Sequence, residues 1–262
     1  MVREALERVR REKPLVHHIT NWVTIYDCAN MTRAFGALPV MAHAIEESGD
    51  MARIASALVL NIGTLTPELV ESMIVAGISA NENNIPVVLD AVGVGATPLR
   101  DDKAFEILDR IKVGVIKGNA SEIAKLAGVN AVTRGVEATE VGADLLDTAQ
   151  RLSGLRRATV VITGGEDIVS GGGTSYIVRN GHSLMGAVVG TGCMAASVIG
   201  AFAGVDEDLT RSAACALACY GVAGELAAVD AKGPGSFKEA LFDAVFNLDG
   251  DTAERMARIE TR

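Results

Sequence analysis

Basic residues are scarce in this chain. Its 24 Lys and Arg residues stand against 33 Asp and Glu, which gives a formal net charge of −9. A protein that binds nucleic acid without regard to sequence needs a basic surface, so the composition argues against that class of partner. It does not argue against phosphate binding, because backbone amides and one or two cations can hold a phosphate group.

Long apolar runs are missing as well. No run reaches the roughly 18–20 residues that cross a bilayer. The segment Met1–Lys13 mixes acidic, basic and apolar residues and lacks the apolar centre of a signal peptide. We therefore expect no membrane partner and a cytoplasmic protein.

Cysteines are few, and no two of them form a CxxC pair. Cys28 and Cys193 stand alone, whereas Cys215 and Cys219 lie four residues apart in an apolar helical run. This pattern favours reduced thiols, with Cys215 and Cys219 as small core residues.

Aromatic residues make up only 4% of the chain, although 49% of its 262 residues are apolar, so the core must be built largely from Ala, Val, Leu and Ile. Apolar strands alternate with helical segments, which predicts βαβ units and a mostly parallel, right-handed sheet with helices on both faces. No linker or internal repeat interrupts the pattern, so we expect one domain, residues 1–262. The predicted strands are 37–41, 56–61, 86–90, 113–117 and 158–163, with a hairpin of 168–170 and 174–179. The predicted helices are 4–13, 23–35, 66–82, 101–111, 119–126, 137–153, one from the glycine loop at 190–192, 206–229 and 236–248. Residues 15–21 are predicted to be extended and then polar.

The stretch Val189–Ile199 has the pattern of a glycine loop that leads into a buried helix. Gly190 and Gly192 allow the backbone to approach a ligand closely. The free amides and the dipole at a helix N-terminus favour phosphate. Cys193 is placed in the first turn, where a thiolate is favoured. The alternative is a tight turn followed by an ordinary core helix.

Polar residues follow each predicted strand. In open parallel sheets, ligands bind beyond the carboxyl ends of the strands. The polar blocks at these ends are Met41-Ala42-His43, Asn61-Ile62-Gly63-Thr64, Asp90-Ala91-Val92-Gly93-Val94-Gly95, Lys117-Gly118-Asn119-Ala120-Ser121-Glu122 and Thr163-Gly164-Gly165. The polar blocks after five strands thus predict a binding or catalytic site at one edge of the sheet.

Two acidic residues at this edge are candidates for holding hydrated Mg²⁺. Asp90 comes directly after an apolar strand, where a carboxylate must be solvated, paired or metal-bound. Its alternative is a helix or turn cap. Glu122 lies three residues after Asn119, so it could also be the acid of a capping box. Lys117 adds a cation to the same edge, or is a solvated lysine at a strand end.

Two other constellations are weaker. His17, His18 and His43 fit no zinc spacing. Cys193 and His182 could form a nucleophilic pair, but nothing in the sequence brings them together. The run Gly171–Gly173 is predicted to be a loop tip, because no helix start follows it.

Several blocks resemble hydroxyethylthiazole kinases, which have the ribokinase-like fold. The match extends over nearly the whole chain. The blocks are His18-Ile19-Thr20-Asn21, Pro39-Val40-Met41-Ala42-His43, Leu58-Val59-Leu60-Asn61-Ile62-Gly63-Thr64, Asp90-Ala91-Val92-Gly93-Val94-Gly95-Ala96, Gly118-Asn119-Ala120-Ser121-Glu122, Gly190-Thr191-Gly192-Cys193-Met194 and Lys232-Gly233-Pro234-Gly235-Ser236-Phe237. The cysteine after Gly192 is the sharpest marker, since related sugar and pyrimidine kinases usually carry Asp there. The resemblance implies an α/β three-layer sandwich.

The resemblance also implies an activity: transfer of a phosphoryl group from ATP, with Mg²⁺, to the alcohol of 4-methyl-5-(2-hydroxyethyl)thiazole in thiamine salvage. It implies a homotrimer with sites between subunits. The residues implied are Asn21 and Met41 for the thiazole, Gly190 and Gly192 for the loop around the transferred phosphate, Lys117, Asn119 and Thr163 for the nucleotide, Asp90 and Glu122 for the metal, and Cys193 at the position of the catalytic base.

Two positions depart from the family pattern. Ala91 stands where the family usually has Pro, and Lys117 where it usually has Arg. Lysine neutralises a phosphate but cannot bind it with two parallel hydrogen bonds. Rival interpretations are an ATP-dependent dehydratase of hydrated nicotinamide nucleotides, a hydroxymethylpyrimidine-type kinase on the same fold, and a non-enzymatic binder.

Overall fold

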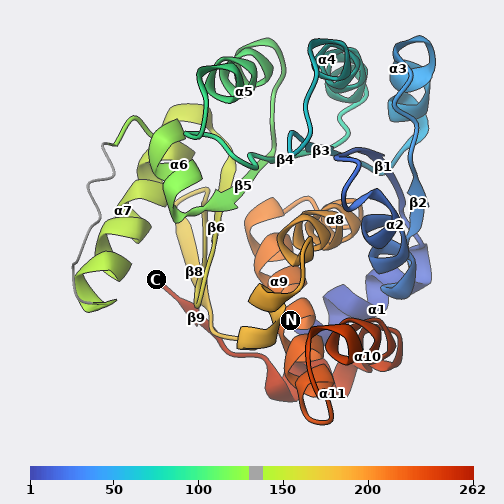
Figure 1. Cartoon of the computed structure of the whole chain (residues 1–262), viewed down its shortest axis with the longest axis vertical. Coiled ribbons are helices and arrows are strands. Elements are labelled where there is room, and N and C mark those ends of the chain that lie inside the picture. Colours follow the sequence, from blue (N-terminus) through green and yellow to red (C-terminus); the bar gives the residue numbers. More distant parts are fainter. Residues whose placement is uncertain (130–137) are drawn as a thin grey trace.

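A single nine-stranded sheet forms the centre of the computed structural model (Figure 1). The structure describes the whole chain except residues 130–137, and residues 138–144 are described by their backbone alone. The strand order is β2-β1-β3-β4-β5-β6-β7-β8-β9. The strands are β1 (Leu15–Ile19), β2 (Leu38–Val40), β3 (Ala57–Asn61), β4 (Val87–Asp90), β5 (Val115–Asn119), β6 (Thr159–Thr163), β7 (Asp167–Gly171), β8 (Thr174–Val178) and β9 (Ile259–Thr261).

The first six strands are parallel, and the last three add antiparallel pairs at one edge. Parallel strands need crossover connections, and the helices that make them cover both faces of the sheet. One face carries α1 (Val2–Glu12), α2 (Ile25–Ala34), α8 (Thr191–Ala203), α9 (Leu209–Ala228), α10 (Pro234–Asn247) and α11 (Gly250–Met256). The other carries α3 (Ile45–Ile54), α4 (Pro67–Glu82), α5 (Pro98–Arg110), α6 (Ala120–Leu126) and α7 (Ala138–Arg156). A short 3₁₀ turn, η1 (Ser183–Ala187), precedes α8. The expected α/β three-layer sandwich is confirmed.

Side chains of the apolar strands alternate between two cores. Val59 and Val88 pack against the helices of the α8 face. Leu58 and Leu89, their neighbours in the chain, pack against the α4 face. This is the period of two of a strand, and both faces are apolar because both are covered.

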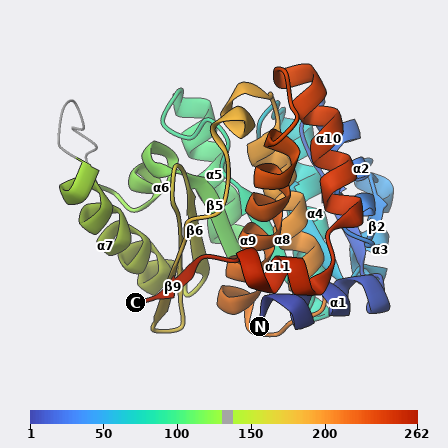
Figure 2. The same cartoon turned by 90° about the horizontal axis from the view of Figure 1, so that it is seen from below.

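The first and last helices of the chain meet on the α8 face. Figure 2 shows α11 beside α1, and these helices are in contact. The Met1 ammonium and the Arg3 amide both donate to the Glu254 carboxylate. Among the residues that the structure describes, no helix combines the length and the apolar character needed to span a bilayer.

The five predicted strands and the hairpin are confirmed. The hairpin turns at Gly172 and Gly173, which have φ of +58° and +83°. Positive φ at both central positions suits the twist of a two-residue turn, and glycine adopts it without a steric cost. The helix expected at 101–111 begins three residues earlier, at Pro98, behind a Thr97 cap. The start expected for α7 at Glu137 lies outside the described residues.

Besides the 3₁₀ turn η1, four elements were not predicted as such. Segment 15–21, expected to be extended, contains strand β1, whose two histidines interrupt its apolar pattern. The other three are short: α3, α11 and β9. β9 pairs with β8 through contacts distant in sequence, so no local pattern announces it.

The two histidines of β1 are core residues. His18 is 1% exposed, and its ring nitrogens meet the Val16 carbonyl and the Thr32 hydroxyl at 3.1 and 3.4 Å. Burial lowers the pKa of His18 from 6.5 to about 4, so the ring is neutral at pH 7.

The protein should lose stability as the pH falls from 6.5 towards 4. The unfolded chain binds a proton on His18 before the folded chain does, so acid favours unfolding in this window. Between about pH 7.5 and about pH 5 this residue should account for about 2 kcal/mol. Urea unfolding at both pH values measures it, and His18→Gln should show a smaller loss than the wild type. Equal losses in the two proteins would show that His18 does not titrate in this way.

Candidate active site

Four polar side chains lie at the carboxyl ends of neighbouring parallel strands. Asn21 follows β1, Asn61 ends β3, Asp90 ends β4, and Lys117 lies in β5. All four are buried, with Asp90 fully inaccessible and Lys117 4% exposed. The strand register pairs Asn61 with Asp90 and Asp90 with Lys117, so adjacent strands bring the side chains side by side.

These side chains form one continuous chain of hydrogen bonds. Lys117 Nζ donates to Asp90 Oδ1 at 2.9 Å, and Asn61 Nδ2 donates to Asp90 Oδ2 at 2.6 Å. Asn21 Nδ2 donates to Asn61 Oδ1 at 3.0 Å and to Cys193 Sγ at 3.4 Å. The chain therefore links the buried ion pair on β4 and β5 to the thiol at the start of α8.

The Asp90–Lys117 pair is ionised. Burial by itself lowers the pKa of Lys117, but the Asp90 carboxylate more than offsets this and holds that pKa above its ordinary value. Burial also raises the pKa of Asp90, against the opposing effects of Lys117 and Asn61. Because each oxygen of Asp90 already accepts a hydrogen bond from a nitrogen, we assign the carboxylate form.

The glycine loop lies directly above this pair. Gly190 has φ of +94° and is the N-cap of α8. A Cβ at Gly190 would come within 2.5 Å of Thr24, and one at Gly192 within 3.3 Å of Lys117 Nζ. The Thr191 hydroxyl donates to the Met185 carbonyl at 2.8 Å, which ties the loop to the turn before it.

The surroundings of the loop favour an anion. The N-terminus of α8 carries a partial positive charge and free amides, and the Lys117 ammonium lies beside it. The Asp90 carboxylate compensates the Lys117 ammonium but not the partial positive charge of the helix N-terminus. A phosphate bound here would interact with both positive groups. The Cys193 thiol, half-buried in the first turn of α8, would face it from the helix.

Glu122 forms the capping box that its spacing predicts. Its Oε2 accepts from the Asn119 amide at 2.7 Å, and the Asn119 side chain accepts from the Glu122 amide at 3.0 Å. Its Oε1 accepts from the Gly93 amide at 2.8 Å, which ties α6 to the loop after β4.

A hydrated Mg²⁺ suits these carboxylates better than a closed protein cage: Glu122 is 8% exposed, whereas Asp90 is fully buried and would act on the ion as a neighbouring charge. Their four oxygens already accept hydrogen bonds, but each keeps a further lone pair. Mg²⁺ retains waters and is held by one or two carboxylates together with substrate phosphates. Among the described residues there is no group of three or more His, Cys, Asp or Glu that could hold a metal.

Arg100 is a site residue that the sequence did not reveal. Its guanidinium, on α5, donates to the carbonyls of Ile62 and Gly63 after β3 and to that of Val92 after β4, at 2.8–2.9 Å. It thereby holds together the two loops that follow Asn61 and Asp90. From the sequence, Asn61 was predicted only to lie at the end of a strand, without a role in the site.

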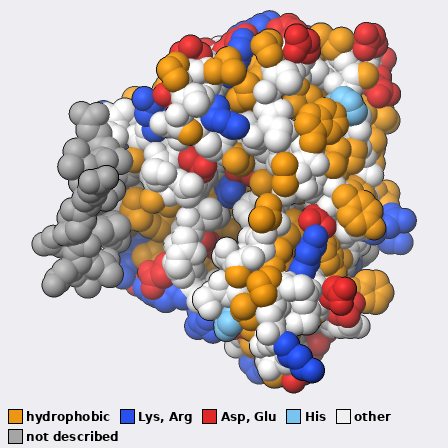
Figure 3. Space-filling view, in the orientation of Figure 1, with side chains coloured by type: hydrophobic (Ala, Val, Ile, Leu, Met, Phe, Trp, Pro, Cys, Tyr) orange, Lys and Arg blue, Asp and Glu red, His pale blue; other side chains and the backbone are white. Residues whose placement is uncertain are grey.

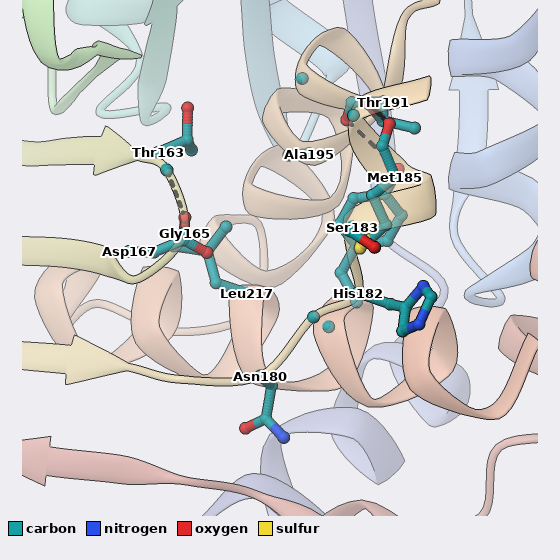
Figure 4. Close-up of a pocket in the computed structure, with 16 residues that line it drawn as sticks. Thr163, Gly165, Asp167, Asn180, His182, Ser183, Met185, Thr191, Ala195 and Leu217 are labelled. Carbon is teal, nitrogen blue, oxygen red and sulfur yellow. Dashed lines mark hydrogen bonds between the residues drawn. The ribbon is translucent and has the colours of Figure 1, made fainter. Parts of the chain in front are cut away.

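A cavity of about 550 Å³ opens next to the glycine loop. Figure 4 shows Thr163 and Asp167 on one side of it and Thr191 and Met185 on the other. The Gly164 amide donates to Asp167 at 3.0 Å, and burial raises the pKa of Asp167 to about 6. The cavity is large enough for a nucleotide, and it connects the end of β6 with the start of α8.

Met41 lies apart from the hydrogen-bonded residues. It follows β2, is partly buried and packs against the core of the α8 face.

The carbonyl of Ala42, the residue after Met41, accepts a hydrogen bond from His17 on β1, whose Nε2 lies 2.6 Å away. Since a carbonyl only accepts, that nitrogen carries the proton, and Nδ1 has no partner among the described residues. His43 stacks edge-on against Trp22, with ring centroids 4.8 Å apart.

The structure therefore brings most of the predicted residues to one place. Asn21, Asp90, Lys117 and Cys193 share one network, Gly192 lies over Lys117, and Thr163 reaches the Gly118 carbonyl at 3.4 Å. The alternatives of a cap for Asp90 and a solvated lysine for Lys117 are wrong, because the two residues form a buried ion pair. The two histidines of β1 are core residues, a position that the sequence did not predict. Cys215 and Cys219 are buried, free thiols, as predicted.

Removal of the cation should destabilise the fold strongly. Lys117→Met leaves the Asp90 carboxylate buried without a counter-charge, and the free energy of unfolding should fall by about 3–5 kcal/mol. Urea unfolding measures the change. The matched control is Lys125→Met, whose partner Asp101 lies at 3.0 Å in a half-exposed pair and which should cost less than about 1 kcal/mol. Similar costs for the two variants would contradict a dependence on burial.

Comparisons with known proteins match nearly the whole chain to one family. A model of the hydroxyethylthiazole kinase family matches residues 6–251. Hydroxyethylthiazole kinase of Methanosarcina acetivorans is 58% identical over 259 residues, 99% of each chain. The solved structure of hydroxyethylthiazole kinase from Pyrococcus horikoshii OT3 has a TM-score of 0.92 at 41% identity and covers 100% of this chain and 98% of its own. A ribokinase-like superfamily protein from Enterococcus faecalis V583 shares the fold, with a TM-score of 0.63 at 14% identity, covering 88% of this chain and 86% of its own.

Proposed function

The chain belongs to the hydroxyethylthiazole kinase family and is a kinase, and we propose that it phosphorylates the alcohol of 4-methyl-5-(2-hydroxyethyl)thiazole with ATP and Mg²⁺. The observation that carries the proposal is the meeting of three features at one point. These are the glycine loop of α8, the Lys117 ammonium beneath it and the Cys193 thiol in its first turn. The family match favours a kinase over the dehydratase and over a non-enzymatic binder.

Phosphoryl transfer depends on positioning and on the stabilisation of negative charge. In our proposal the amides of Gly190–Gly192 and the dipole of α8 bind the transferred phosphoryl group. Lys117 lies close enough to the loop to add a full positive charge, and Asp90 holds it there at 2.9 Å. As a lysine it acts as a point charge, without the two-pronged contact of the arginine usual in the family.

The Asp90 and Glu122 carboxylates are assigned to the hydrated Mg²⁺, which when bound would neutralise charge on the phosphates. Ala91 after Asp90 replaces the usual Pro, and its amide donates to the Lys117 carbonyl at 2.9 Å. A proline could not make this bond. The substitution therefore adds a ladder hydrogen bond between β4 and β5 at the metal site.

The nucleotide is assigned to the cavity between β6 and α8. Thr163 and the glycines after it line one wall, and Thr191 lies on the opposite wall beside the phosphate loop. Asn119 lies at the end of the next strand, β5, where it caps α6. The thiazole is assigned to the Met41 side of the edge, where a thioether can contact an aromatic ring.

Cys193 is assigned as the residue that accepts the proton of the alcohol. In a loose transition state the proton leaves late, so the contribution of a base is modest, about 10–100-fold. The product would serve thiamine salvage. The four free cysteines fit the reducing conditions of the cytoplasm, and the single sheet fits one kinase domain over residues 1–262.

Purified protein with Mg²⁺ should consume ATP when the thiazole is present, and mass spectrometry should detect the thiazole phosphate. Cys193→Ala should lower kcat by about 10–100-fold and leave measurable turnover, because phosphate positioning remains. Cys193→Asp should retain more activity than Cys193→Ala, since a carboxylate is ionised at pH 7.

Two results would contradict the proposal. ATP consumption that responds to hydroxymethylpyrimidine or to other alcohols, and not to the thiazole, would mean that the substrate is wrong. Full activity in Cys193→Ala would exclude the role of the thiol.

We also propose that three copies of the chain assemble with the sites between them. Large apolar side chains are exposed next to site residues: Trp22, Val23 and Tyr26 follow Asn21, and Val189 precedes Gly190. Figure 3 shows hydrophobic side chains gathered on the side of the molecule where Figure 1 places α2 and α3. Such a patch at the mouth of a site favours contact with a second copy.

Light scattering after size exclusion should give three times the mass of the 27.2 kDa chain. Tyr26, which is 78% exposed, lies in this patch, and Tyr26→Glu should shift the mass to that of the monomer and raise the KM for the thiazole. Leu155→Glu, at a similarly exposed apolar position on α7, is the control and should stay trimeric. A monomeric wild type would overturn this assembly.

A further inference from the structure

The orientation of the Asn21 amide is determined by its neighbours. Its Oδ1 accepts hydrogen bonds from the amides of Val23 and Thr24, both at 3.1 Å. Only the oxygen of a side-chain amide can accept them. The Nδ2 group must therefore point the other way, towards Asn61 and Cys193.

The direction of the next bonds follows. Asn21 Nδ2 donates to Asn61 Oδ1 at 3.0 Å and to Cys193 Sγ at 3.4 Å. The sulfur is the acceptor, because an amide nitrogen has no lone pair to offer. The thiol hydrogen must therefore point away from Asn21, and among the described residues no hydrogen bond has Cys193 Sγ as its donor.

Asn61 holds Asn21 in this orientation. Its Oδ1 accepts from Asn21 and from the Gly63 amide at 2.9 Å, and its Nδ2 donates to Asp90 at 2.6 Å. Asp90 is in turn held by Lys117. Reversing either amide would break bonds at both ends, so the buried ion pair fixes the direction of the whole chain.

We propose that Asn21 is a positioning residue for Cys193: its buried amide donates to the sulfur and orients the side chain towards the alcohol. This deepens the proposed function and rests on it for the role of the thiol as a base. Only the thiolate can accept the proton of the alcohol, as the alcohol oxygen bonds to the γ-phosphorus and the bond from phosphorus to ADP breaks. The hydrogen bond from Asn21 occupies one side of the sulfur and leaves the other side to face the alcohol.

The proposal differs from the thiazole contact that the resemblance implies for Asn21. Both polar atoms of its side chain are engaged within the protein, and the residue is 3% exposed. If Asn21 contacted the thiazole ring, its substitution would raise the KM for the thiazole. A positioning role affects kcat and the reactivity of the thiol.

Thiol alkylation tests the proposal without substrate. The other three cysteines are at most 1% exposed, so iodoacetamide should react with Cys193 in the resting, full-length protein. Asn21→Asp keeps the oxygen that caps Val23 and Thr24 but replaces the donor by a carboxylate, and alkylation should slow at least ~10-fold. Asn21→Ser keeps a capping hydroxyl without reaching the sulfur, and should slow it ~3–10-fold. Asn83→Asp adds the same charge on an exposed residue after α4 and should react like the wild type.

A double-mutant cycle separates positioning from general disruption. Asn21→Ser should lower kcat by ~5–10-fold in the wild-type background, and by less than ~2-fold when Cys193 is already Ala. Equal factors in both backgrounds, or an alkylation rate in the two Asn21 variants no lower than in the wild type, would overturn the proposal. If the thiazole is not a substrate, the proposed function fails, and the alkylation rates still decide the role of Asn21.

Discussion

The buried ion pair of Asp90 and Lys117 is the interaction on which the site depends. Two charges on neighbouring strands, almost completely removed from water, are tolerable only as partners, since either one alone would cost several kcal/mol. The pair links the carboxyl ends of β4 and β5. It also carries one end of a chain of amides that reaches β3, β1 and the start of α8. The Arg100 guanidinium donates to three carbonyls in the loops after β3 and β4 and so supports the same edge of the sheet from α5.

This arrangement places positive charge where a phosphate would bind. The amides and dipole of α8 and the ammonium of Lys117 converge below a loop that has room only for glycine at Gly190 and is close-fitting at Gly192. At Gly190 the backbone is left-handed and a Cβ would collide with Thr24, so conformation and space both require the absence of a side chain. Because these groups are fixed before any ligand arrives, little reorganisation accompanies the reaction.

Much of the fold follows from local patterns. Apolar strands bounded by turn residues predicted β2 to β6, and Asn119 with Glu122 predicted a capping box that the structure confirms. Strand β1 was predicted only as an extended segment, because a buried strand normally lacks histidine. His17 and His18 occupy the core as neutral rings that hydrogen-bond the backbone and Thr32, and two of their three partners, Ala42 and Thr32, lie 25 and 14 positions away.

The sequence by itself determined which strand ends are polar and that a glycine loop precedes a buried helix bearing Cys193. These features follow from composition and spacing within a few residues. Tertiary structure alone decided that Lys117 points into the protein at Asp90, that Asn61 joins two networks and that Arg100 binds the loops after β3 and β4. The residues in most of these contacts are separated by 27, 29, 40 and 37 positions in the chain, whereas the contact of Arg100 with Val92 spans 8. Such contacts depend on strand order and register, which place side chains together only after the whole sheet has formed.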